Sequence, residues 1–218
     1  MRPDVGEALR YLGIPNPPED LRWEAEGMAE VLSAAVQPRY TYRVFGLEHL
    51  SDGVRLDGAG VVLTGSTALA MLAQCGRAAV LACTLGARFD AALRALQAQD
   101  MAKAVLHDAL GSAFVEAGCD QAEREIAARF PDLYLTDRFS PGYGDLPLEI
   151  QPALCAALDT GRRLGVTVTQ SLLMNPAKSV TAVIGLSDTP QPARIRGCAH
   201  CNFKENCQFR KEGTTCGL

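Results

Sequence analysis

The stretch VTVTQSLLMNPAKSVTAVIGL, residues 166–186, decides the fold that we predict for this chain. It contains two apolar, β-branched runs, residues 166–174 and 179–186, and the short segment NPAK joins them. Runs of this composition, bounded by Asn and Pro, predict strands. Two strands that follow each other so closely favour an antiparallel arrangement. We therefore expect an α+β body with a mainly antiparallel, twisted sheet.

The segments before this stretch add helices and further strands. Apolar residues at helical spacing predict a short helix between Pro3 and Gly13, and a longer one that Pro38 ends. Residues 88–130 are expected to be almost wholly helical. In that region Asp100 is a candidate N-cap, and Gly111 and Gly118 are expected weak points between helical segments. Further strands are predicted near residues 40–44, 54–56, 61–63, 79–83 and 134–136, and further helices after Ser66 or Thr67 and at residues 152–158. The segment TGST before the first of these helices could present a helix N-terminus to an anion, or could be an ordinary capped helix.

The loop RFSPGYGDLP, residues 138–147, is the strongest candidate for a binding site. Its two prolines and two glycines fix an unusual backbone path, which lets main-chain groups approach a ligand closely. Arg138 at its entrance offers a planar fork suited to a carboxylate, and Tyr143 offers an aromatic face suited to a cation. A carboxylate combined with a cation is the charge pattern of an amino acid or of S-adenosylmethionine. A Pro/Gly surface loop with one structural Arg is the alternative.

Two blocks of this chain resemble one known family. Arg138-x-x-Pro141-Gly142-Tyr143 followed by Pro147 is similar to the R-P-A-P-G-Y-x-x-x-P loop of the activation domain of cobalamin-dependent methionine synthase. The segments LGVTVTQS and MNPAKSV, which come next in the same order, resemble that domain's T-G-M-x-L-T-E-S and M-W-P-x-A-S-V. The resemblance covers most of the chain from position 40 to position 187, and it also fits the small stand-alone relatives of that domain.

The resemblance implies a ligand and a set of residues that hold it. In the family, the loop binds S-adenosylmethionine. Carried over, Arg138 would hold the methionine carboxylate, and the backbone at Ser140 and Gly142 would meet the adenine and ribose. Tyr143 would line the pocket near the cobalt face. No catalytic side chain is assigned.

The resemblance also implies a role beside a partner protein. The family's domain docks on a corrinoid-carrying module and helps return cob(II)alamin to methylcobalamin by reductive methylation. We therefore expect a stand-alone protein that supports a cobalamin-dependent methyltransferase of methionine biosynthesis. Its partners would be a corrinoid-binding methyltransferase subunit, which carries the cobalamin, and a flavodoxin or ferredoxin as electron donor. Whether such a protein counts as an enzyme depends on where the methyl transfer is assigned. Asp145 and Glu149 could substitute for the acidic N-terminal element that holds the ligand's amino group in the long enzyme.

The C-terminal tail is a candidate metal site. Cys198, Cys201, Cys207 and Cys216 follow the spacing C-x2-C-x5-C-x8-C, in a segment with too few apolar side chains to bury a core of its own. Four thiolates bind zinc, and they also bind iron–sulfur clusters. The spacing does not distinguish zinc from an iron–sulfur cluster, and free reduced thiols are the third possibility. A redox-active cluster would make the chain an iron–sulfur electron-transfer protein that reduces a corrinoid protein, which is the alternative function.

Composition excludes other classes of protein. The 218 residues are 48% hydrophobic and 21% charged, with a net charge of −4, as in an ordinary soluble globular protein. No apolar run reaches the ~18 residues of a membrane span, and the N-terminus has no signal-peptide pattern, so we expect a cytoplasmic protein with reduced thiols. From Gln191 onward the charge is +3, so the rest of the chain carries −7. An acidic body argues against nucleic-acid binding, which depends on neutralising phosphates.

The chain therefore divides into three predicted parts. They are an N-terminal helical segment (1–38), an activation-domain-like body (39–190) and the four-cysteine tail (191–218). His49 and His107 have no partner at metal-ligand spacing and are expected to be structural or exposed. The cysteines of the body are expected to be small core residues, namely Cys75, Cys83, Cys119 and Cys155.

Overall fold

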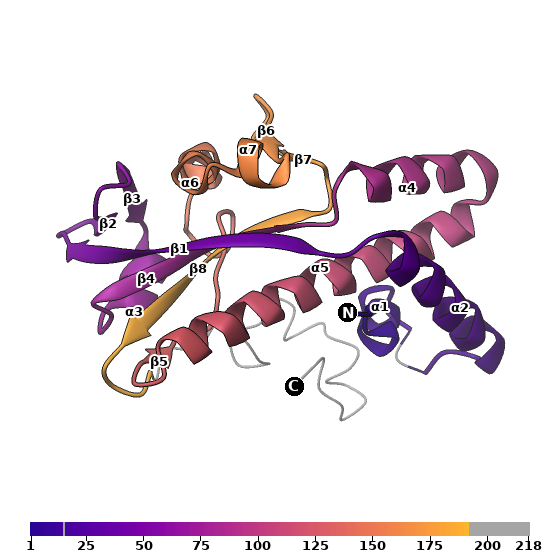
Figure 1. Cartoon of the computed structure of the whole chain (residues 1–218), viewed down its shortest axis with the longest axis horizontal. Helices are drawn as coiled ribbons and strands as arrows, with labels where there is room; N and C mark the ends of the chain where they lie inside the picture. The colour runs from indigo at the N-terminus through magenta and orange to yellow at the C-terminus, as the bar shows by residue number, and fades with distance from the viewer. Residues whose placement is uncertain (15, 192–218) are drawn as a thin grey trace.

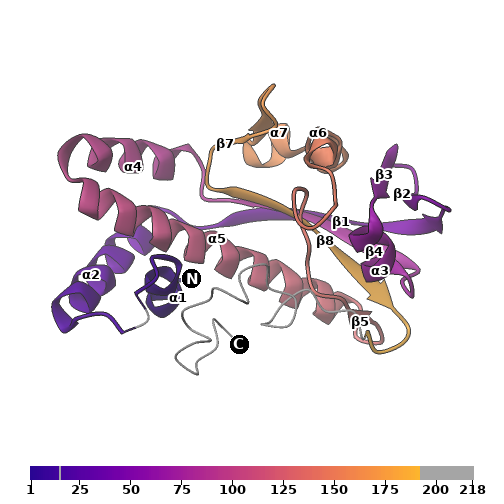
Figure 2. The same ribbon diagram turned by 180° about the vertical axis from the view of Figure 1, so that it is seen from behind.

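An antiparallel sheet separates two layers of helices in this protein (Figures 1 and 2). The computed structural model describes residues 1–14 and 16–191, so the four tail cysteines lie outside the described residues. Within that part of the chain, six strands follow the order β3-β2-β1-β4-β8-β5, and every neighbouring pair is antiparallel. The strands are β1 (Arg39–His49), β2 (Gly53–Leu56), β3 (Val61–Thr64), β4 (Arg77–Thr84), β5 (Tyr134–Leu135) and β8 (Ser179–Ser187). The predicted α+β class and antiparallel sheet are confirmed.

Strand β4 is the centre of the sheet, because β1 and β8 flank it and helices cover both of its faces. Its residues from Ala78 to Thr84 are all at most 1% exposed. Ala79, Leu81 and Cys83 pack into one hydrophobic cluster, whereas Ala78, Val80 and Ala82 pack into the other. A strand that is buried on both faces reads as a continuous apolar run, which is why the sequence marks this one clearly.

The first layer consists of α1 (Val5–Tyr11), α2 (Glu19–Ala35), α4 (Ala87–Gln99) and α5 (Met101–Arg129). Helix α5 runs diagonally beneath the sheet in Figure 1, and α1 and α2 pack against it. Asp100 caps α5, as predicted, by accepting a hydrogen bond from the Lys103 N–H at 3.1 Å. Helices α1 and α2 bury their apolar residues in the same cluster as α5 and the sheet.

Gly111 and Gly118 are not weak points between helices, because α5 continues through both of them. The structure gives each glycine a packing role. A Cβ at Gly111 would lie 2.1 Å from the ring of Phe89, and a Cβ at Gly118 would lie 2.6 Å from the Cys83 sulfur. These two positions are glycine because the neighbouring elements pack directly against the backbone of α5.

The second layer consists of α3 (Ser66–Leu72), a 3-10 turn η1 (Leu148–Ile150), α6 (Gln151–Leu158) and α7 (Thr160–Leu164). The loop that contains residues 138–147 connects β5 with η1 and passes from one layer to the other (Figure 2). Helix α7 was not predicted. Among the described residues, no helix is long and apolar enough to cross a membrane.

The prediction of one strand over residues 166–174 is wrong. The segment forms β6 (Thr167–Val168) and β7 (Met174–Asn175), which pair with each other in a small separate sheet. A turn joins them, in which Leu172 has a φ of +64° and the Thr169 hydroxyl accepts from the Leu173 N–H. Strand β8 pairs with β4 and β5 instead. The polar triplet Thr-Gln-Ser at residues 169–171 forms the turn and was misread as strand.

Candidate functional site

One side of α5 carries a row of polar side chains spaced by three and four residues, which places them on one face of the helix. We call this row the α5 polar stripe, and its members are Asp108, Ser112, Glu116, Asp120 and Glu123. The four carboxylates are partly exposed, with side-chain exposures between 29% and 49%. The stripe therefore presents a line of negative charge that is open to solvent.

Arg138 lies against the C-terminal half of this stripe. One guanidinium nitrogen is 2.6 Å from Glu116, and another is 2.6 Å from Asp120 and 2.7 Å from Glu123. The Arg138 side chain is only 8% exposed, so the three carboxylates compensate a nearly buried cation. Burial alone would lower the pKa of Arg138, but the hydrogen bond and the charge of Glu116 raise it overall.

Lys178 provides a second cation at the other end of the stripe. Its ammonium group donates to Asp108 and to the hydroxyl of Ser112, each at 2.9 Å. Lys178 comes from the connection between β7 and β8, in the segment whose sequence resembles the second family block. The first and second blocks thus place one cation each on the same helix face, a convergence that the linear sequence does not show.

Asp145 anchors the far end of the 138–147 loop to α3. Its carboxylate accepts from the Ser66 N–H at 2.6 Å, the Ser66 hydroxyl at 2.7 Å and the Thr67 N–H at 2.8 Å. Hydrogen bonds from Thr67 and Ser66 hold the pKa of Asp145 well below its usual range. The anion at this helix N-terminus is therefore supplied by the loop itself, and Asp145 is engaged there rather than at an amino group of a ligand.

The predicted site residues of the loop lie between these two anchors. The Ser140 carbonyl accepts from the Tyr143 N–H at 3.0 Å, and the Gly142 N–H donates to the Leu146 carbonyl at 2.9 Å. Gly142 has a φ of +83°, which glycine adopts without strain. Tyr143 is 42% exposed. The structure places Arg138 against α5 and the tip of the loop near α3, and the ligand contacts assigned to these residues remain predictions.

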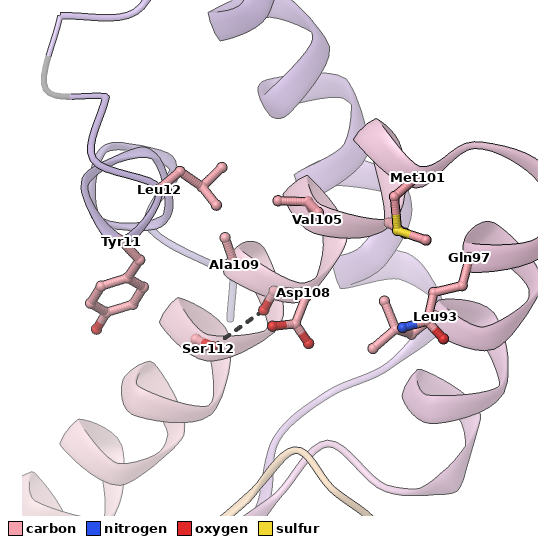
Figure 3. A pocket seen from close by; sticks show the side chains of 10 residues that line it. Tyr11, Leu12, Leu93, Gln97, Met101, Val105, Asp108, Ala109 and Ser112 are labelled. Atoms are coloured by element: carbon pink, nitrogen blue, oxygen red, sulfur yellow. Dashed lines mark hydrogen bonds between the residues drawn. The ribbon is translucent and has the colours of Figure 1, made fainter.

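A cavity of about 280 Å³ adjoins the N-terminal half of the stripe (Figure 3). Tyr11 at the end of α1 and the following Leu12 lie on one side of it, and Leu93 and Gln97 of α4 lie on the other. Residues of α5, including Asp108 and Ser112, line the space between them. Burial raises the pKa of Tyr11, and the hydrogen bond and charge of Glu7 raise it further. The charge of Glu116, a member of the stripe, adds to this increase.

Sequence reasoning did not find this stripe or the contribution of α1. The stripe has a signal in the sequence, because polar residues recur at steps of four from Asp108 to Asp120, and every residue between them is apolar or glycine. The body cysteines are buried as predicted, and His107 is buried as well. Within residues 1–14 and 16–191, no three His, Cys, Asp or Glu side chains form a group that could hold a metal.

One comparison with known proteins gives a match. No protein-family model matches the chain, and no curated protein matches it. Among solved structures, the fold is similar to that in a crystal structure of the MetH reactivation domain bound to AdoHcy, with a TM-score of 0.67. The match covers 93% of this chain and 75% of that chain, at 18% sequence identity. At this identity the likeness concerns the fold.

Proposed function

We propose that this protein has an activation-domain-like role: it binds S-adenosylmethionine beside the α5 polar stripe and supports a cobalamin-dependent methyltransferase. The observation that carries the proposal is the position of Arg138, a forked cation from the family-like loop, among three carboxylates of α5. The likeness of the fold to a reactivation domain crystallised with AdoHcy supports the same class of ligand.

The charges of the site match those of the ligand. S-adenosylmethionine carries a carboxylate, an ammonium group and a sulfonium group, so its net charge is positive. The stripe has four carboxylates, and Arg138 and Lys178 neutralise two of them, which leaves negative charge to attract a cationic ligand. Arg138 would exchange its pairing with Asp120, the most exposed of its three carboxylate partners, for the ligand carboxylate. Glu116 would accept from the ligand ammonium.

The reaction would take place between this protein and its partner. A corrinoid-binding methyltransferase subunit would bring the cobalamin, and a flavodoxin or ferredoxin would deliver the electron. This chain would hold the methyl donor in position, since in such reactions the protein contributes binding and orientation. Transfer of the methyl group from the sulfonium is irreversible in practice and pulls the unfavourable reduction forward.

Calorimetric titration with S-adenosylmethionine and S-adenosylhomocysteine tests the binding site. We expect Arg138→Ala to weaken binding at least about tenfold, since a charge-assisted hydrogen bond contributes about 1.5–3 kcal/mol. Arg138→Lys keeps the charge but loses the planar fork, so its affinity for the ligand should lie between that of the unmodified protein and that of Arg138→Ala. Arg162→Ala is the matched control, because Arg162 is 81% exposed and its one salt bridge within the described residues is with Asp159.

A second variant guards against a folding defect. Removing Arg138 leaves three carboxylates together, so circular dichroism must show that Arg138→Ala is folded. Glu116→Gln removes a ligand partner and leaves Arg138 paired with Asp120 and Glu123. Absence of heat with the unmodified protein, or equal affinity in all variants, refutes the assigned site.

The tail carries a separate proposal, on residues outside the described ones. We propose that Cys198, Cys201, Cys207 and Cys216 bind one metal centre. Anaerobic purification followed by metal analysis and visible absorption separates the readings. Iron with sulfide and a brown colour would support the electron-transfer alternative, and zinc would exclude it. Metal-free protein would refute the centre.

A further inference from the structure

At the end of the molecule opposite β5, α2 and α4 flank the start of α5 (Figures 1 and 2). Residues of these three helices line a large apolar groove. Its volume is about 930 Å³. We call it the α2–α4 groove, and its lining includes Met28 and Leu32 of α2 and Phe89, Ala92 and Leu96 of α4. It is separate from the α5 polar stripe, with which its lining shares no residue.

Helix α2 exposes two of its apolar side chains to solvent along this groove, although Leu32 is buried. Its buried residues include two alanines, Ala25 and Ala29, each with no exposed surface. In contrast, Trp23 and Val31 line the groove and are each 72% exposed. Monomeric proteins rarely keep a tryptophan and a valine so open beside an apolar groove, and such surfaces mark interaction sites.

The charges around the groove are complementary across it. Helix α2 contributes Glu24, whereas Arg88 comes from α4 and Lys103 from α5. The α2 sequence EDLRWEAEGMAEVLSAA has five carboxylates and a single arginine. The α2 wall of the groove lining therefore carries one carboxylate, Glu24, and the opposite wall carries two cations, Arg88 and Lys103.

We propose that the α2–α4 groove is the interface of a two-fold symmetric dimer of this chain, in which Trp23 of each copy enters the groove of the other. In a two-fold interface the same patch meets itself, so each contact occurs twice with the roles exchanged. An acidic wall beside a basic wall satisfies this condition: α2 of one copy faces α4 of the second copy, and Glu24 meets Arg88. A partner helix of a single charge type would match only one wall.

Sedimentation velocity and Trp fluorescence test the dimer on the full chain, under reducing conditions that prevent disulfide cross-links. Trp23 is the only tryptophan, so its emission reports this site alone. With rising concentration, we expect the mass to double and the emission to shift to shorter wavelength over the same range. Trp23→Ala is expected to weaken dimerisation at least about tenfold, because buried tryptophans dominate interfaces. A monomer at all concentrations, or a Trp23→Ala dimer as tight as the unmodified one, overturns the proposal.

A charge exchange distinguishes a second copy from any other occupant. Glu24→Arg and Arg88→Glu alone should each weaken the dimer, because like charges then meet across the two-fold axis. The double variant restores both pairs and should regain most of the affinity. Arg94→Glu is the matched control, since Arg94 is on α4 but outside the groove lining. Failure of the double variant to recover, or an equal effect of Arg94→Glu, contradicts the pairing.

Discussion

Gly111→Ala is expected to destabilise the protein, although alanine is the better helix former. A Cβ at this position would lie 2.1 Å from Cζ of Phe89 and 2.5 Å from another carbon of its ring. Phe89 is fully buried, and its ring stacks on His107 with 4.7 Å between the centroids, so it has little room to move. Overpacking costs about 1–3 kcal/mol, and the gain in helix propensity returns about 1 kcal/mol.

A 2.1 Å contact with a buried ring favours the upper end of the overpacking cost, about 3 kcal/mol. After the gain of about 1 kcal/mol, the net expectation is a loss of about 2 kcal/mol, or roughly 4–8 °C in the melting temperature for a domain of this size. Urea unfolding and calorimetry of the unmodified protein and of Gly111→Ala measure it. Phe89→Leu removes the ring, so Gly111→Ala should cost less in that background, and a double-mutant cycle gives the coupling. Gly161→Ala is the control, since no atom of the part of the chain that the structure describes lies within 4 Å of a Cβ there. A neutral or stabilising Gly111→Ala would show that Phe89 does not hold this contact.

Two further substitutions test the anchored loop and the buried histidine. Asp145→Asn weakens the hydrogen bonds to Ser66 and Thr67, so limited proteolysis within residues 138–147 should become several-fold faster, and an unchanged rate would contradict the anchoring. Burial lowers the pKa of His107 below its usual 6.5, and its Nε2 atom has no hydrogen-bond partner among the described residues. The unfolded chain therefore takes up the proton at higher pH, and stability should fall as the pH drops below about 6.5. His107→Leu should flatten this dependence in denaturant titrations at pH 5–8, and an identical slope in both proteins would refute it.

The parts of the fold that the sequence predicted are those with local signals. Pro38 and the residues around Pro3 and Gly13 mark helix limits, and Asp100 marks a cap, because capping and proline geometry act within a few residues. The strand at 79–83 was recognisable because burial on both faces leaves an uninterrupted apolar run.

The features that were missed depend on contacts between distant segments. The anion for the α3 N-terminus comes from Asp145, 79 residues beyond Ser66, and no local pattern points to it. Gly111 was expected to be a weak point in the helix, but glycine is needed there because the ring of Phe89, from another helix, packs against the backbone. The loop containing Arg138 was recognised as a candidate, but the carboxylates around its guanidinium depend on how α5 packs.

Helix α5 is one unbroken rod of 29 residues, and both proposed surfaces lie along it. Lys103, in the groove, and Asp120, beside Arg138, are 17 residues apart, which corresponds to about 25 Å at 1.5 Å per residue. The groove lining also reaches His107, next to Asp108 of the stripe, so the separation holds for the Arg138 end of the stripe. A subunit bound in the groove therefore leaves Arg138 and the carboxylates around it uncovered. Dimerisation and ligand uptake should then be independent, and a saturated dimer should contain two molecules of methyl donor.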